Sequence, residues 1–337
     1  MDLTNQPQPT ASVVVVTWNA MKYVRECLLS LQAEETVSVE VIVVDNNSSD
    51  GTAELIQHEF PHFKLIRNSD NHGFSKANNV GIEQAHGKYI CLVNSDVVVL
   101  QGCLEKLLLF MEDDPQIGLL GPQMVGPEGE VRRSCMRRPS IFNCLTRALA
   151  LDRLPLLSRA LKSQMMSDFA HNQIQEVDVL NGWFWVVRRE ALASVGPLDE
   201  RFFIYAEDLD WSYRFREAGW KVMFYPEAAA IHYGGASSSA APVRFCIEMQ
   251  KAEFQYWQKH YSPWICSIHR AIVFLHHGLR FLGHSLLYSV NVKRVESGSK
   301  ARQSWALLSW MLTGRQPKNQ GPNDRVKTSA LEVSPSA

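Results

Sequence analysis

The sequence lacks the features that mark several common classes of protein. Its seven cysteines form no Cys-x-x-Cys pair, which argues against a zinc ribbon or a dithiol redox site and favours reduced cytoplasmic thiols. Thirty-four Lys and Arg against 35 Asp and Glu give a net charge of −1, so nothing attracts the chain generally to nucleic acid. Residues 1–10 are polar and contain no apolar run, so we expect a flexible segment and no signal peptide.

Two nucleotide-binding signatures are also missing. No Gly-x-Gly-x-x-Gly follows the first apolar run, and no Gly-x-x-x-x-Gly-Lys-Ser/Thr occurs in the chain. Any nucleotide must therefore be held by other groups, such as carboxylates that bind a base, a ribose or a cation.

The first hundred residues show an alternation of strand and helix patterns. Apolar, β-branched runs at 12–17 and 39–44 flank a helical pattern at 22–32, and a third run at 89–93 follows a helix-like stretch at 75–86. Runs that are apolar on both faces are typical of central parallel strands. The pattern predicts a doubly wound α/β domain.

Polar residues follow each of the three predicted strands. In such sheets, the carboxyl ends of the strands open onto one crevice where ligands bind. We therefore expect one cleft to receive these candidates: Thr17 and Asn19 from the first strand, Asp45 and Asn47 from the second, and Asn94, Ser95 and Asp96 from the third.

Residues 126–176 are rich in arginine and weak in pattern, which predicts a loop-and-helix insertion over the cleft on the acceptor side. Guanidinium groups match diphosphate oxygens bidentately, so Arg137 and Arg138 are candidates for diphosphate binding. A solvated basic face is an equally good interpretation.

The segment 196–220 combines acidic residues with a helical pattern that Gly219 ends. Glu207 and Asp208 lie where the helix begins, where one acid would suffice to cap it. Because Asp210 is a third acid, the cluster exceeds what capping requires.

These motifs, in this order, give the chain a family likeness. From Ser12 to Tyr233 it resembles the family 2 glycosyltransferases with a GT-A fold, particularly the rhamnosyltransferase-like branch. The likeness rests on four segments: Thr17-Trp18-Asn19, Val44 to Gly51, Asn94-Ser95-Asp96, and Tyr205 to Asp210.

The resemblance implies a GT-A domain over residues 11–241, with a mixed, mostly parallel sheet flanked by helices. It also implies inverting transfer of a sugar from a dTDP- or UDP-sugar to a hydroxyl of a saccharide or lipid-linked saccharide in cell-surface polysaccharide synthesis. Rhamnose is the sugar that this branch suggests.

The resemblance also assigns roles to residues around the donor. Asp45 would hydrogen-bond the base, Thr17 and Asn19 would line the same pocket, and Gly73 and Asn78 would flank the nucleotide. Asn47 belongs to the same motif.

The triplet Asn94-Ser95-Asp96 is similar to the family's metal-binding element, in which the last Asp reaches a Mg²⁺ or Mn²⁺ ion. The family usually has Asp where this chain has Asn94, which removes one negative charge but keeps an oxygen ligand. His232 matches a histidine that completes the metal site in some relatives, and a structural histidine is the alternative.

Glu207 and Asp208 resemble the catalytic element, with Asp208 as the base and Glu207 either raising its pKa or binding the acceptor. Trp183 is the candidate acceptor contact, whereas Trp185 and Trp211 are expected in the core.

The C-terminal quarter is predicted to be helical over 242–292, with a basic, polar and partly disordered tail over 293–337. Within 264–290, apolar residues repeat at steps of three and four, and histidines and arginines occupy the opposite side. This pattern favours a helix in the interface of an anionic membrane, so that the protein would be cytoplasmic at the inner face of the cytoplasmic membrane. Docking of the helix on the enzyme's own core is the alternative.

Other functions are less consistent with the sequence. A processive polysaccharide synthase should carry a Gln-x-x-Arg-Trp element and several spanning helices, which are not found. A nucleotidyltransferase stays open, and Asn94 keeps open a non-catalytic nucleotide-sugar-binding assembly protein.

Overall fold

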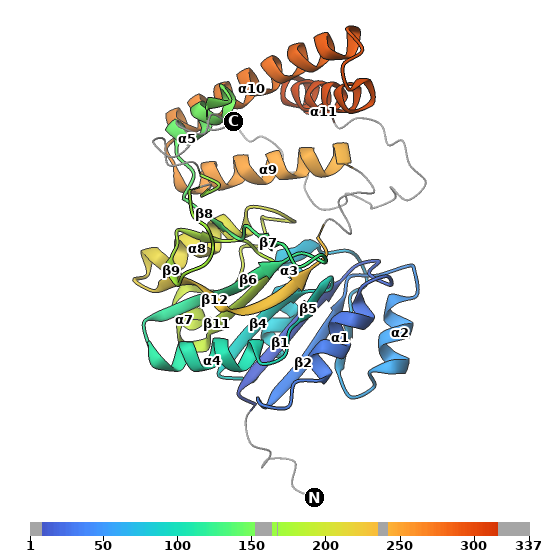
Figure 1. The fold of residues 1–337 in the computed structure, drawn as a ribbon, viewed down its shortest axis with the longest axis vertical. Helices are drawn as coiled ribbons and strands as arrows, with labels where there is room; N and C mark the ends of the chain where they lie inside the picture. The colour runs from blue at the N-terminus through green and yellow to red at the C-terminus, as the bar shows by residue number, and fades with distance from the viewer. Residues whose placement is uncertain (1–8, 152–163, 167, 235–241, 316–337) are drawn as a thin grey trace, which may run out of the picture.

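The computed structural model describes residues 9–151, 164–166, 168–234 and 242–315. One large sheet with helices on both faces forms the lower part of the molecule in Figure 1, and a group of helices stands above it. The expected flexibility of residues 1–8 and of the tail beyond 315 concerns residues outside the described ones.

The N-terminal half of the sheet is parallel. Its strands run in the order β3 (Lys64–Arg67), β2 (Val39–Asp45), β1 (Ala11–Thr17) and β4 (Tyr89–Asn94). Val13 is paired with Val41 on one side and with Cys91 on the other. The three strands that the apolar runs predicted are therefore neighbours, and their carboxyl ends meet at one edge.

The second half of the sheet mixes directions. It continues with β11 (Phe184–Arg188), β6 (Ile117–Val125), β12 (Lys221–His232) and β5 (Val97–Val99), while β7 (Val131–Arg132) pairs with β6 and β9 (Gln175–Glu176) with β12. β11 runs antiparallel to β4, and β12 runs parallel to β6. A separate short pair joins β8 (Cys135–Met136) to β10 (Val179–Leu180).

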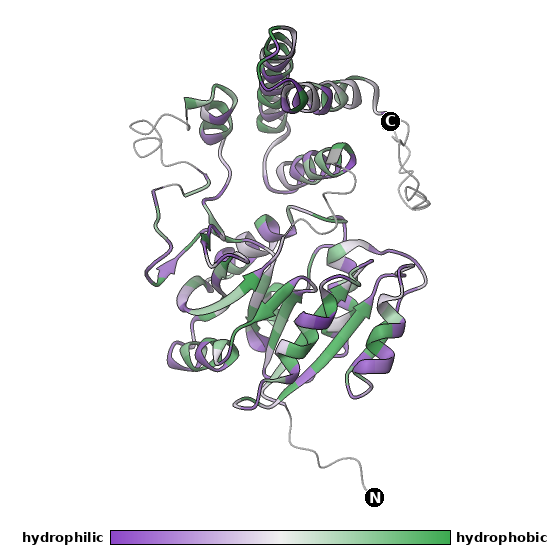
Figure 2. Ribbon diagram, turned by 45° about the vertical axis from the view of Figure 1, so that its right-hand side comes forward, coloured by the Kyte–Doolittle hydropathy of each residue, from purple (hydrophilic) through white to green (hydrophobic). Residues whose placement is uncertain are grey.

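Helices cover both faces of the sheet. Alternate strand residues point to opposite sides, and the apolar side chains on each side need to be buried. Val13 and Val15 lie in one core with α1 (Val24–Gln32) and α4 (Cys103–Asp113), whereas Val14 lies in a second core. That second core includes residues of α3 (Gly73–Glu83), α7 (Arg189–Val195) and α8 (Glu207–Glu217). α2 (Thr52–Glu59) completes the first half. In Figure 2 the strands are mostly hydrophobic, as burial on both faces requires.

The remaining helices form a layer of their own. α9 (Pro242–His260) lies between the sheet and α10 (Pro263–Ser289), and α11 (Arg294–Thr313) and α5 (Ile141–Ala148) pack against α10 (Figure 1). The described part of the arginine-rich insertion thus includes a helix that joins this layer, and residues 294–313, expected in a polar tail, form a helix. Within the described residues, no helix combines the length and the apolar character needed to cross a membrane.

α10 does not turn its leucine-rich side toward the protein, as docking of that side on the core would require. His269 is fully buried, whereas Leu279, Leu282 and Leu286 are 46%, 65% and 64% exposed. The side of α10 that carries histidines therefore faces the protein, and much of its leucine side faces solvent.

Candidate active site

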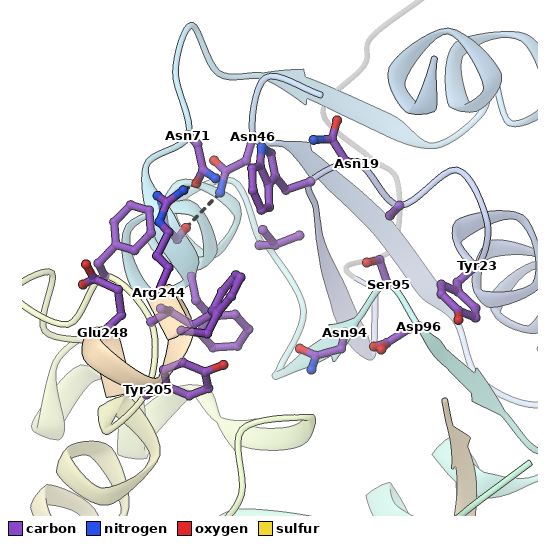
Figure 3. Close-up of a pocket in the computed structure, with 18 of the residues that line it drawn as sticks. Asn19, Tyr23, Asn46, Asn71, Asn94, Ser95, Asp96, Tyr205, Arg244 and Glu248 are labelled. Atoms are coloured by element: carbon purple, nitrogen blue, oxygen red, sulfur yellow. Dashed lines mark hydrogen bonds between the residues drawn. The ribbon is translucent and has the colours of Figure 1, made fainter. Parts of the chain in front are cut away.

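A cavity of about 280 Å³ lies at the carboxyl ends of the parallel strands. The ends of all three predicted strands contribute to it, together with the loop before α8 and the start of α9 (Figure 3). Its lining includes Trp18 and Asn19 after β1, Asn46 after β2, Asn94, Ser95 and Asp96 after β4, Phe203 to Tyr205, His232 and three residues of α9. The expected convergence of strand ends on one cleft is therefore observed.

Asp45 lies at the end of β2 and orders the loop that follows it. One carboxylate oxygen accepts from Thr17 Oγ1 at 3.0 Å and the other from the Ser48 N–H at 3.0 Å. Asp45 is 2% exposed and does not line the cavity, and neither does Thr17, whereas Asn47 is exposed. The contact of these residues with a base stays a prediction.

Asn19 ties the end of β1 to the same loop. Its backbone N–H donates to Ser48 Oγ at 2.9 Å, and its Oδ1 accepts from the Ser49 N–H at 2.8 Å. Asn19 itself has φ of 50°, the left-handed region that Asn tolerates better than most residues. These bonds place its side chain at the rim of the cavity, as labelled in Figure 3.

Asn46 and Gly73 hold the loop before α8 against the cavity. Asn46 Nδ2 donates to the Gly73 carbonyl at 2.9 Å, and the Phe74 N–H donates to the Phe203 carbonyl at 2.6 Å. At Gly73, φ is +79° and a Cβ would lie 2.3 Å from Phe203 O, so only glycine fits. Asn46 was not a sequence candidate, although it adjoins Asp45 in the same motif.

Asn78 lies away from the cavity. It is buried, and its side chain donates to the Phe74 carbonyl one turn earlier in α3. Its neighbour Asn79 both donates to Leu198 O and accepts from Leu198 N, and so anchors the segment that leads to α8. The described structure thus gives these asparagines structural partners.

Asp96 and His232 form the polar pair on the cavity wall. His232 Nε2 lies 3.2 Å from Asp96 Oδ1, and both side chains are largely buried. Two ligands at right angles on an octahedral ion with bonds of about 2.1 Å would lie about 3 Å apart, so the pair fits a divalent cation. Asn94 and Ser95 add neighbouring oxygens on the same wall.

Trp183 supports this pair and does not line the cavity. Its ring stacks on His232 with centroids 5.5 Å apart and planes 17° apart, and it is 3% exposed. Its carbonyl accepts from the Asn94 N–H at 3.0 Å. An acceptor contact by Trp183 stays a prediction, while Trp185 and Trp211 lie in the core as expected.

Glu207 and Asp208 begin α8 without capping it by a side-chain hydrogen bond. The preceding Tyr205 and Ala206 have φ of 69° and 63°, two consecutive left-handed residues that turn the chain sharply. Asp208 Oδ1 accepts from the Leu209 N–H at 2.8 Å, and within the described structure Glu207 Oε2 has no hydrogen-bond partner. A buried acid without a partner is costly when charged.

Burial perturbs both acids in the same direction. It raises the pKa of Asp208 to about 6, against the opposing hydrogen bonds from backbone N–H groups that include Gly182. Burial and the adjacent Asp208 charge raise the pKa of Glu207 to about 8. At neutral pH the pair therefore holds one proton.

A continuous set of contacts joins the two acids to the cavity, although neither acid lines it. Gly182 hydrogen-bonds Asp208, and the next residue, Trp183, stacks on His232, which pairs with Asp96. Tyr205, two residues before Glu207, lines the cavity directly. The acidic pair and the Asp96–His232 pair thus belong to one assembly.

Asp210, the third acid of the cluster, has a structural role. It is fully buried and contacts Arg214 at 2.9 Å, Lys259 at 2.7 Å and His260 at 2.7 Å. These contacts connect α8 to the end of α9.

The two arginines expected at a diphosphate point elsewhere. Arg137 forms a bidentate pair with Asp168 at 2.8 and 2.7 Å, and Arg138 donates to Tyr261 OH and lies 4.2 Å above the Tyr213 ring. Neither lines the cavity.

Arg244 lines the cavity instead, together with Phe245 and Glu248 from the first two turns of α9. Figure 3 shows Arg244 and Glu248 on the wall opposite Asn94, Ser95 and Asp96. Sequence reasoning missed Arg244 because no motif marks it, and only the path of α9 brings it to the cavity.

Comparison with known proteins supports the interpretation of these motifs. The model of the family described as Glycosyl transferase family 2 matches residues 12–196. An N-acetylglucosaminyl-diphospho-decaprenol L-rhamnosyltransferase of Mycobacterium tuberculosis is 26% identical over 267 residues, which cover 75% of this chain and 85% of the relative. The low-salt glycan biosynthesis hexosyltransferase Agl10 of Haloferax volcanii is 24% identical over 226 residues, 66% of each chain.

Two solved structures share the fold. The mannosyltransferase PcManGT from Pyrobaculum calidifontis, in complex with GDP-Man and Mn²⁺, matches with a TM-score of 0.52 and 16% identity over 90% of this chain and 88% of that one. S. aureus TarS 1–349 in complex with UDP matches with a TM-score of 0.50 and 16% identity over 91% of this chain and 92% of that one. The expected GT-A fold is confirmed.

Proposed function

The chain belongs to glycosyl transferase family 2, and from that premise we propose that it is an inverting, metal-dependent enzyme. The expected membership in this family, with rhamnosyltransferase relatives, is confirmed. The observation that carries the proposal is the joining of the buried Glu207–Asp208 pair, through Gly182 and Trp183, to the Asp96–His232 pair on the cavity wall.

Asp208 acts as the base in this proposal. With its pKa raised to about 6, Asp208 is ionised at neutral pH and a stronger base than an exposed aspartate. Glu207, with its pKa raised to about 8, keeps its proton and can donate a hydrogen bond to the acceptor oxygen. The pair can therefore orient a hydroxyl and take its proton.

The proposed transfer also needs groups that stabilise the departing diphosphate. Asp96 and His232 would hold Mg²⁺ or Mn²⁺, with oxygens of Asn94 and Ser95 nearby. The bound cation would stabilise the negative charge of the leaving diphosphate. Arg244 faces this wall across the cavity, and we propose it, in place of Arg137 and Arg138, as the cationic side chain nearest the donor.

Transfer and donor-binding assays with and without EDTA test the proposal. We expect a metal-requiring activity in which Asp208→Asn lowers kcat by roughly 10²- to 10⁴-fold and leaves donor affinity nearly unchanged. Asp96→Asn should instead raise the cation concentration needed for half-maximal activity. Tight donor binding without turnover by the unaltered protein would favour the non-catalytic assembly protein.

The relatives support a proposal for the substrates. One relative is named as a rhamnosyltransferase acting on N-acetylglucosaminyl-diphospho-decaprenol, so we propose a lipid-linked saccharide as acceptor and dTDP-rhamnose as donor, with UDP-sugars as the alternative. A thermal-shift screen of nucleotide sugars in the presence of Mn²⁺ identifies the donor by the largest rise in melting temperature.

A lipid-linked acceptor requires access to a membrane surface, and α10 offers a suitable face. Leu279, Leu282 and Leu286 are exposed on it, with Trp264 at 65% and Trp305 of α11 at 56%. Exposed basic residues of the same layer include Arg270, Arg294 and Arg302. We propose that this layer lies on the anionic inner face of the cytoplasmic membrane.

A further inference from the structure

Three side chains with different ligand chemistry meet in the helical layer, away from the donor cavity. Cys144 comes from α5, Glu253 from α9 and His269 from α10, and their ligand atoms all lie within 4.8 Å of one another. A separate cavity of about 40 Å³, lined by all three residues, lies between these helices.

The distance between two of these groups already matches a tetrahedral metal site. His269 Nε2 lies 3.2 Å from Glu253 Oε1. Two ligands on a tetrahedral zinc ion with bonds of about 2.0–2.1 Å are about 3.3 Å apart. A sulfur bonded at about 2.3 Å would lie about 3.6 Å from each of them, so small side-chain rotations bring Cys144 into place.

The imidazole is held in a fixed orientation. His269 is fully buried, and the Trp257 ring stacks on it with centroids 4.4 Å apart and planes 14° apart. Gln250 Nε2 lies 2.9 Å from the second oxygen of Glu253, which fixes the carboxylate as well. A ligating carboxylate that is itself hydrogen-bonded, as Glu253 is, is typical of metal sites.

Unsatisfied polar atoms gather around the same small cavity. Within the described residues, Nδ1 of His269 and Nδ1 of His277 are buried and have no hydrogen-bond partner, and both side chains line the cavity. Burial lowers the pKa of His277 to about 4, so its ring adds no positive charge beside the cavity. Burial raises the pKa of the Cys144 thiol to about 12, so the thiol is protonated when no metal is bound.

We propose that Cys144, Glu253 and His269 form a zinc site that ties α5, α9 and α10 together. A thiolate with an imidazole and a carboxylate suits Zn²⁺, whereas the oxygen-rich wall at Asp96 suits Mg²⁺ or Mn²⁺. Zinc binding replaces the thiol proton, which is released to solvent as the S–Zn bond forms. Water takes the fourth position. Because α9 also carries Arg244, the ion would fix the helix that borders the donor cavity.

Cobalt titration of the full-length protein tests this site, because a thiolate-to-cobalt charge-transfer band appears only when a cysteine ligates the ion. We expect the band to saturate at one equivalent in the unaltered protein and in Asp96→Asn, which alters the donor-side wall. Cys144→Ser should abolish the band and weaken zinc binding by roughly tenfold or more. Cys246→Ser, which removes a thiol of α9 outside the cluster, should change neither.

Absence of the band in the unaltered protein would overturn the proposal, as would its persistence in Cys144→Ser. If Cys144→Ser does not fold, Glu253→Gln provides a second variant in which the cysteine is intact. We expect it to weaken zinc binding while the charge-transfer band persists at higher cobalt concentration. Unchanged zinc affinity in Glu253→Gln would also contradict the site.

Discussion

At the residue scale, the roles proposed for Glu207 and Asp208 predict how activity depends on pH. We expect kcat/KM to rise through about pH 6, as Asp208 loses its proton, and to fall again near pH 8, as Glu207 loses its own. Glu207→Gln should keep the acid limb and lose the alkaline decline, because glutamine cannot ionise. A pH profile of both proteins checks this expectation. An alkaline decline that persists in Glu207→Gln would assign that limb to another group.

Gly73 and Gly102 offer a matched test of close packing. Both have positive φ, +79° and +72°, but an added Cβ at Gly102 meets nothing within 4 Å, whereas at Gly73 it would clash with Phe203. Gly102→Ala should cost about 1 kcal/mol in free energy of unfolding from backbone strain alone. Gly73→Ala should cost about 3 kcal/mol and weaken donor binding, because the loop before α8 must move. Denaturant unfolding and donor titration of both variants measure the difference, and equal losses would contradict it.

The candidate site could be predicted from sequence where a motif follows a strand. Asn19, Asn94, Ser95 and Asp96 line the cavity because the ends of adjacent parallel strands must meet at one edge. Arg244 could not be predicted, because it is placed by the path of a helix far along the chain. Arg137 is the opposite case. The arginine-rich composition suggested that it binds a diphosphate, but its partner in the structure is the carboxylate of Asp168.

At the scale of elements, sequence periodicity identified α10 and its two faces but not the face that docks. Histidines and arginines are usually the solvent side of an amphipathic helix. Here His269 is buried among aromatic rings and beside Glu253, and Ile272 and Val273 are buried with it, so the docked face combines a histidine with apolar residues. The alternation of strands and helices in residues 12–94 was predicted well, because each strand there is apolar on both faces.

The connection between α8 and α9 depends on Asp210. Its pKa lies below the usual range because contacts with His260, Arg214 and Lys259 outweigh burial. The resulting stabilisation is fully present above the unfolded-state pKa of about 3.9 and is lost as pH falls below it, toward the folded-state value. Asp210→Asn should lower the free energy of unfolding by about 3 kcal/mol at neutral pH, because the buried cations lose their counter-charge.

Melting temperatures measured from pH 7 to pH 3 check this prediction. The difference between Asp210→Asn and the unaltered protein should stay constant down to about pH 4 and shrink below it. Glu296→Gln, which removes an exposed ion pair with Lys300, should leave the melting temperature nearly unchanged. A pH-independent difference for Asp210→Asn would attribute its effect to packing and not to charge.

At the scale of the whole molecule, α10, the helix with the exposed leucines, lies at the end of the protein opposite α4 (Figure 1). Changing Leu279, Leu282 and Leu286 together to serine should reduce binding to vesicles that contain anionic lipid, because each leucine contributes apolar surface to the interface. Leu109→Ser on α4 removes a leucine that is 59% exposed and should not affect binding. Sedimentation with vesicles measures both, and equal binding of the triple variant would contradict the proposed orientation.

The position of α9 has a consequence for any shortened version of the protein. Its first turns supply a wall of the cavity at the strand ends, and its last turn supplies Lys259 and His260 to Asp210. A fragment that stops at residue 234, where the final strand of the sheet has ended, would lack one side of its own binding pocket. The smallest fragment that keeps the whole cavity therefore reaches at least His260, and experiments that separate the proposed membrane binding from sugar transfer should cut after that residue.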